Sequence, residues 1–135
     1  MYLLDTNIIL EFLLDQDKAD EIERFLHATS PEHLYLSEFA LYSLGIVLFR
    51  HKRYEAFWHS VKDLLVTGGI RLLRLGVEDM RDITQVAQRF NLDFDDAYQY
   101  VAAEKYDLTL VSFDSDFDRT ERGRRTPVEI LGSMT

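Results

Sequence analysis

The sequence contains no cysteine, which excludes disulfide bonds and any metal site built on thiolates. It also has no apolar run of about 18 residues, so we expect no membrane-spanning helix. The opening residues carry no basic stretch and reach an acid at Asp5, so we expect no secretory signal. A cytoplasmic protein is therefore expected, and the absence of cysteine is compatible with a reducing compartment.

Positive charge is scarce, with 15 lysines and arginines against 24 acids and a net charge of −9. This balance argues against a broad nucleic-acid-binding surface. The objection is reduced if some acids hold a divalent cation that partly neutralises them. The bases also gather in two clusters, from Arg50 to Arg53 and from Arg119 to Arg125. Each cluster either faces a phosphate backbone or forms a solvated loop, and the sequence leaves both interpretations open.

Several catalytic patterns are missing. The four histidines show no metal-ligand spacing and adjoin no serine-based triad, and the six glycines form no phosphate-binding loop. A phosphatase on a flavodoxin-like fold would need a catalytic lysine near the carboxyl edge of its sheet. The late lysine available, Lys105, is predicted at the far end of a helix, which disfavours this alternative.

The length of 135 residues and the 47% apolar content fit one compact domain covering residues 1–135. Short apolar runs that alternate with segments of helical periodicity predict an α/β sandwich around a mainly parallel sheet. The predicted strands are 2–4, 34–36, 70–75 and 108–113, with a possible edge strand at 128–131; the predicted helices are 7–14, 38–49, 53–66, 77–90 and 93–106, with another beginning at residue 17. The helix at 38–49 is apolar nearly all round, which predicts a central, buried position.

Three acids stand where this fold class places ligands. Asp5 follows the first predicted strand, Asp114 follows the strand at 108–113, and Asp96 opens the helix before that strand. Ligands of open parallel sheets bind beyond the carboxyl ends of the strands. Clustered carboxylates repel one another and are costly without a cation. Oxygen ligands alone suit Mg²⁺ or Mn²⁺, ions that promote phosphodiester hydrolysis.

Each acid also has a structural interpretation. Asp5 can cap the helix that follows it. Asp93 and Asp95 favour the dipole at a helix start, and for these two we prefer that role. Asp114 and Asp116 can belong to an ordinary turn. It is the shared placement of Asp5, Asp96 and Asp114 that favours a metal site.

Three motifs carry a resemblance to a known family. They are Leu3-Leu4-Asp5-Thr6-Asn7, the stretch Phe94-Asp95-Asp96-Ala97, and the run from Leu108 to Phe117. In this order and spacing the chain resembles the PIN domains, especially the toxin ribonucleases of VapBC-type toxin–antitoxin pairs. The resemblance implies a PIN-like α/β/α sandwich, Mg²⁺ or Mn²⁺ as cofactor, an RNA substrate, an antitoxin partner and a homodimer.

The resemblance also implies roles for single residues. Asp5, Asp96 and Asp114 match the catalytic metal ligands, and Thr6, Asn7 and Asp116 match residues that support the metal. One position departs from the family, which carries a glutamate six residues after a serine that begins the central helix. That serine is Ser37, and the residue six further on is Ser43. We expect Ser43 to hydrogen bond to a metal-bound water.

Glu38 is a poor substitute for the missing glutamate. It precedes Ser43 by five positions, which is about 140° around a helix, so both residues do not face one ion. Two functions therefore stay open. The leading one is a metal-dependent endoribonuclease that acts as a toxin. The alternative is a catalytically weak PIN-fold module that binds RNA or a protein.

Large aromatic side chains crowd two successive helices and predict a homodimer, because aromatic residues are enriched at interfaces. These residues are Tyr42, Phe49, Tyr54, Phe57 and Trp58.

Overall fold

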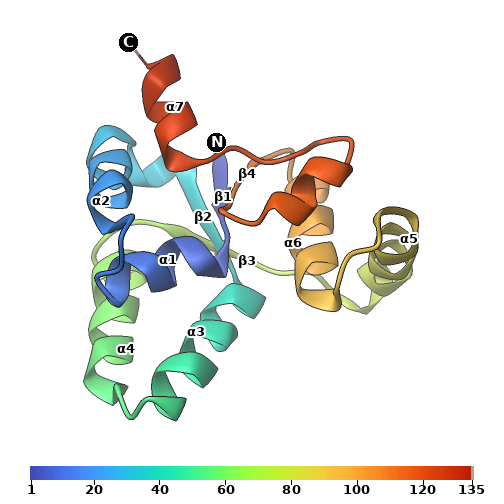
Figure 1. The fold of residues 1–135 in the computed structure, drawn as a ribbon. Coiled ribbons are helices and arrows are strands. Elements are labelled where there is room, and N and C mark those ends of the chain that lie inside the picture. Colours follow the sequence, from blue (N-terminus) through green and yellow to red (C-terminus); the bar gives the residue numbers. More distant parts are fainter. Residues whose placement is uncertain (135) are drawn as a thin grey trace.

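A computed structural model describes residues 1–134, and its strands form one parallel sheet (Figure 1). The strands are β1 (Tyr2–Leu4), β2 (Leu34–Ser37), β3 (Arg71–Leu73) and β4 (Thr109–Val111). Their order is β3-β2-β1-β4, and each neighbouring pair is parallel. The carboxyl ends of all these strands consequently lie at one edge of the sheet.

Helices cover both faces of the sheet. The α-helices of residues 1–134 are α1 (Thr6–Leu13), α2 (Ala19–Ala28), α3 (Glu38–Arg50), α4 (Tyr54–Val61), α5 (Met80–Phe90), α6 (Phe94–Lys105) and α7 (Pro127–Ser133). In Figure 1, α5 and α6 lie on one side of the sheet, and α1 and α2 lie on the other. The predicted α/β sandwich is confirmed. Within the described part of the chain, no helix combines the length and apolarity needed to cross a membrane.

Alternation along the strands divides the core into two parts. Leu3 and Leu110 pack in one buried cluster with residues of α5 and α6, whereas Leu4 and Val111 pack in another with residues of α1, α2 and α7. This division follows from β geometry, in which successive side chains point to opposite faces. Because both faces of the sheet are covered, β1 and β4 are largely apolar, although β4 lies at one edge of the sheet and begins with the half-buried Thr109.

The ends of the helices agree closely with the signals in the sequence. Ser37 caps α3, with its hydroxyl accepting a hydrogen bond from the Ala40 amide at 3.0 Å. Asn91 ends α5 in the left-handed conformation, with φ of 54°. α4 continues as a π-helical turn over Lys62–Val66, which gives the full extent of the predicted helix at 53–66.

The expectation that the helix at 38–49 is buried all round is wrong. Ala40, Leu44 and Leu48 are buried at a spacing of four residues, but Tyr42, Ile46 and Phe49 are each more than half exposed. This buried stripe and its half-buried neighbours Phe39 and Leu41 contact the core, whereas the face that carries Tyr42, Ile46 and Phe49 lies at the surface. The apolar composition of the helix therefore reflects an exposed apolar surface and not a central position.

The predicted edge strand at 128–131 is also wrong, because this segment lies within α7. Pro127 occupies the first turn, where its missing amide proton costs no helical hydrogen bond. Thr126 and Glu129 form a capping box, in which each side chain bonds to the other residue's backbone amide. The chain does pair with the sheet just before this helix, where Arg125 forms a parallel bridge with Val111.

Two substitutions distinguish this helix from a strand. In a strand, Val128 and Ile130 would share one face; in α7, Ile130 is fully buried and Val128 is 52% exposed. We expect Ile130→Ala to lower the free energy of unfolding by about 2–5 kcal/mol, because it leaves a cavity in the core. Val128→Ala should change it by less than about 0.5 kcal/mol. Chemical denaturation of the two variants measures both values, and equal losses would contradict the helical assignment.

Candidate metal centre

The carboxyl edge of the sheet contains an acidic cavity of about 260 Å³. Asp5 reaches it from the end of β1, Asp114 from beyond β4, and Asp96 from the first turn of α6. The lining residues are Asp5, Thr6, Asn7, Leu10, Phe39, Ser43, Val47, Asp95, Asp96, Gln99 and Asp114. The structure thus brings together the three acids that the sequence places far apart, along with Thr6, Asn7 and Ser43.

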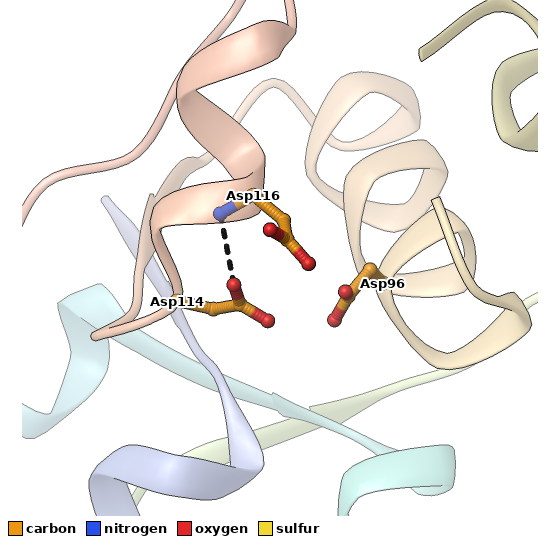
Figure 2. A group of neighbouring side chains, drawn as sticks. All are labelled: Asp96, Asp114 and Asp116. Atoms are coloured by element: carbon orange, nitrogen blue, oxygen red, sulfur yellow. Dashed lines mark hydrogen bonds between the residues drawn. The ribbon is translucent and has the colours of Figure 1, made fainter. Parts of the chain in front are cut away.

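A second acid from the β4 side, Asp116, groups closely with Asp96 and Asp114, and among residues 1–134 this closely spaced group does not include Asp5. Carboxylate oxygens of Asp96, Asp114 and Asp116 lie within 4.8 Å of one another, with Asp96 facing the other two across a gap (Figure 2). The Asp116 amide donates to Asp114 Oδ1 at 2.8 Å, which fixes the turn that presents both acids. Opposite oxygens around one Mg²⁺ ion lie about 4 Å apart, so this spacing and donor type fit a divalent cation.

Asp5 lies deeper than the other acids and accepts three hydrogen bonds. Its Oδ1 accepts from the Thr6 amide at 2.8 Å and from Gln99 Nε2 at 3.2 Å, while its Oδ2 accepts from the Ser112 hydroxyl at 2.7 Å. The bond from Thr6 caps α1. The capping role of Asp5 and its place in the acidic cavity are therefore compatible.

Asn7 and Ser112 connect the two strand ends that carry the acids. The Ser112 hydroxyl accepts from the Asp114 amide at 3.0 Å and from Asn7 Nδ2 at 3.3 Å. Asn7 Oδ1 accepts from the Phe113 amide at 3.3 Å. This network of hydrogen bonds connects the start of α1 to the end of β4. It sets the distance between Asp5 and Asp114.

The electrostatics of the cavity are those of crowded acids. Burial raises the pKa of Asp5 above its usual range, although hydrogen bonds from Ser112 and Gln99 oppose this effect. Burial, followed by the charges of Asp114 and Asp5, raises the pKa of Asp96 to about 7. Ionising every acid at once is therefore costly, and a bound cation would offset that cost.

Ser43 lines the cavity from α3, whereas Glu38 does not belong to the residues that line it. The Glu38 carboxylate accepts from the Tyr42 hydroxyl at 3.2 Å and lies 3.6 Å from Nε of Arg74. The sequence argument that sets Glu38 and Ser43 on different faces of the helix agrees with these positions.

Gln99 and Ser112 take part in the site but escaped the sequence analysis. Ser112 lies two residues before Asp114, at the strand end that was already singled out. Gln99 lies three residues after Asp96, which places both on one face of α6. Spacing could have indicated either residue, but no motif distinguished them. Asp95, which we had assigned to the helix dipole, also lines the cavity.

A family model for the PIN domain matches residues 2–123, which is most of the chain. The chain belongs to the PIN-domain family. The resemblance carried by the three sequence motifs is thereby confirmed. No curated protein matches this PIN domain closely enough to count as a relative.

Solved structures share the fold over nearly the whole chain. A toxin–antitoxin complex from Klebsiella pneumoniae is 21% identical with a TM-score of 0.74, covering 94% of this chain and 98% of that one. FitAcB from Neisseria gonorrhoeae is 21% identical with a TM-score of 0.75, covering 95% and 99%. The sarcin-ricin loop cleaving toxin VapC20 of Mycobacterium tuberculosis is 15% identical with a TM-score of 0.75, covering 87% and 93%.

The raised pKa of Asp96 predicts how the stability of the metal-free PIN domain depends on pH. The pKa of Asp96 is about 7 in the folded chain but about 3.9 in an unfolded chain. Between these values the folded chain binds more protons, so the contribution of Asp96 to stability is present below pH 4 and is lost as the pH rises through 7. Asp96→Asn cannot ionise, so this variant does not lose stability from ionisation at position 96 as the pH rises.

We therefore expect Asp96→Asn to gain stability over the wild type as the pH rises from 5 to 8 in the presence of a chelator. Urea denaturation at several pH values measures this difference. Asp82→Asn, at an exposed acid on α5, controls for the removal of one negative charge. A difference between Asp96→Asn and the wild type that stays constant with pH would contradict the assigned pKa.

Proposed function

We propose that this PIN domain, residues 1–135 as a single unit, is a divalent-metal-dependent endoribonuclease that hydrolyses RNA phosphodiester bonds. The observation that carries the proposal is the convergence of Asp5, Asp96 and Asp114 on one cavity at the carboxyl edge of the sheet. Family membership supports the proposal. One solved structure with this fold is described as a sarcin-ricin loop cleaving toxin, and another as a toxin–antitoxin complex. We infer a similar role here: a cytoplasmic toxin held by an antitoxin.

Asp96 and Asp114 would hold the Mg²⁺ or Mn²⁺ ion together with Asp5, and Asp116 would support them. When bound, such an ion lowers the pKa of a coordinated water and polarises a phosphoryl oxygen. The chain's own part is to hold the carboxylates in position before the ion arrives. Asp5 is fixed by three donors, and Asp114 is fixed by the amide of Asp116. Little reorganisation is then needed at the reacting centre.

Ser43 decides between the leading function and its alternative. The cavity holds a hydroxyl at the position where the PIN family carries a glutamate, so it has one ligand charge fewer. A hydroxyl there can bond to a metal-bound water but contributes no charge to ion binding. The alternative function is a catalytically weak PIN-fold module that binds RNA or a protein, and this missing charge is what favours it.

The two basic clusters differ in their availability to RNA. Arg119 pairs with Asp116 at 3.0 Å, Arg122 with Asp107 at 3.2 Å and Arg124 with Asp118 at 3.1 Å. In contrast, the bases of residues 50–53 lie exposed at the turn between α3 and α4, and within residues 1–134 no ion pair holds them. We propose this turn as the contact with the phosphate backbone.

Cleavage assays with purified protein test the enzymatic proposal. We expect RNA cleavage in the presence of Mn²⁺ or Mg²⁺ and none in a chelator. Asp96→Asn should lose both cleavage and Mn²⁺ binding by calorimetry, because it removes a ligand charge from the proposed ion. Undiminished Mn²⁺ binding by Asp96→Asn would remove this residue from the site.

Ser43→Glu separates the two functions in the same assay. If the missing charge limits catalysis, this variant should bind Mn²⁺ more tightly and cleave RNA faster than the wild type. It should also be less stable without metal and recover with it, since a ligand that binds only the folded state stabilises that state. Metal binding without RNA cleavage in both proteins would favour the binding module.

We also propose a homodimer through the exposed aromatic face of α3 and α4. A groove of about 360 Å³ opens between these helices and is lined by Tyr42, Gly45, Ile46, Phe49 and Phe57. Tyr54 and Trp58 add side chains that are about half exposed. A contiguous apolar surface of this kind is unusual on a monomer and marks an interaction site.

Light scattering at micromolar concentration tests the dimer. We expect the wild type to be a dimer and Ile46→Asp to be a monomer, because a charge in the apolar interface is left without a partner. The matched control is Val77→Asp, since Val77 is highly exposed but lies away from these helices. A monomeric wild type would contradict the proposal.

A further inference from the structure

Gln99 is the least expected polar residue of the acidic cavity. It lies in the middle of α6, is 1% exposed, and has apolar residues such as Val101 and Ala102 as close neighbours along the helix. A buried amide costs free energy unless its donors and acceptors are satisfied. Both ends of the Gln99 amide have partners, and these partners come from the ends of two different strands.

The first partner is Ser37, at the end of β2. The Ala40 amide donates to the Ser37 hydroxyl at 3.0 Å, and that hydroxyl donates to Gln99 Oε1 at 2.9 Å. The second partner is Asp5, at the end of β1, where Gln99 Nε2 donates to Oδ1 at 3.2 Å. A chain of hydrogen bonds therefore runs from the start of α3 through Gln99 to the most deeply buried acid of the site.

The Gln99 amide has one defined orientation in this series of hydrogen bonds. A carboxylate accepts hydrogen bonds and donates none, so the amide group facing Asp5 has to be Nε2. The reverse orientation would set the amide oxygen of Gln99 against a carboxylate oxygen at the same distance. The hydroxyl of Ser37 is compatible with this orientation, because it can donate its single proton to Gln99 Oε1.

The donors around Asp5 are divided unequally between its two oxygens. Oδ1 accepts two hydrogen bonds, from Thr6 and Gln99, which occupies both of its lone pairs. Oδ2 accepts one hydrogen bond, from Ser112, and retains one lone pair. The oxygen that remains available to a cation is therefore Oδ2.

From this arrangement we infer that Gln99 is a positioning residue of the metal site, which acts by clamping Oδ1 of Asp5 so that Oδ2 is directed to the ion. The inference rests on the proposed metal-dependent function. Gln99 would act on the ion through Asp5, the acid that its amide contacts. Substitution of a residue that orients a metal ligand in this way commonly lowers metal affinity by about 10- to 100-fold.

Calorimetric titration with Mn²⁺ alone tests the role of Gln99 without relying on activity. Gln99→Met keeps the length of the side chain and removes the donor to Asp5, and we expect it to weaken Mn²⁺ binding by about 10-fold or more. The matched control is Tyr98→Phe, on the same helix, which removes the buried bond that the Tyr98 hydroxyl accepts from the Leu75 amide at 3.0 Å. This control should keep the affinity for Mn²⁺ within about 2-fold, because the hydroxyl that it removes bonds to the Leu75 amide and the aromatic ring stays in place.

Ser37→Ala provides a second test that does not depend on the folding of a single variant. If Ser37 acts through Gln99, then Ser37→Ala should weaken Mn²⁺ binding in the wild type but not further in Gln99→Met. Wild-type affinity in Gln99→Met, or equal losses in Gln99→Met and Tyr98→Phe, would overturn the inference and leave the proposed function intact. Failure of the wild type itself to bind Mn²⁺ would overturn the proposed function, and the role of Gln99 with it.

Discussion

Repulsion between carboxylates at one edge of a small sheet is the constraint on which the structure of this site depends. Asp5, Asp96, Asp114 and Asp116 come from three parts of the chain and meet at the carboxyl ends of β1 and β4. Their mutual repulsion raises the free energy of the folded chain when no cation is bound. Hydrogen bonds and an ion pair offset part of this cost. Asp5 accepts three hydrogen bonds, and Asp116 forms an ion pair with Arg119.

The parallel sheet explains why the acids meet at all. β1 pairs with β4 in register, so that Leu4 lies opposite Val111 and the residues that follow both strands emerge side by side. Packing of Leu3 and Leu110 on one face and of Leu4 and Val111 on the other holds these strands in place. The burial of these apolar side chains offsets the free-energy cost of the acidic edge.

Much of this arrangement follows from the sequence, because it depends on local signals. Apolar runs ended by an acid predict β1 and β4, and the serine and asparagine at helix ends predict the start of α3 and the end of α5. The convergence of Asp5, Asp96 and Asp114 follows from the rule that parallel strands share one carboxyl edge. The family motifs add the supporting residues Thr6 and Asn7, which do line the cavity.

The errors arise where tertiary contacts decide. Three apolar residues at 128–131 (Val128, Ile130 and Leu131) resemble a strand, but the capping box of Thr126 and the burial of Ile130 make the segment helical. The composition of α3 does not reveal which of its faces is covered, so its exposed aromatic side could not be foreseen. Gln99 escaped notice for a related reason, since its importance lies in partners that are 62 and 94 residues away.

The central claim is that Asp5, Asp96 and Asp114 hold one divalent cation at the carboxyl edge of the sheet. A crystal structure of the protein grown with Mn²⁺, with anomalous scattering recorded at the manganese edge, tests that claim most directly. The account predicts one anomalous peak within coordinating distance of Asp96, Asp114 and Oδ2 of Asp5. A well-ordered acidic cavity with no peak, or a peak bound by other residues, would contradict it.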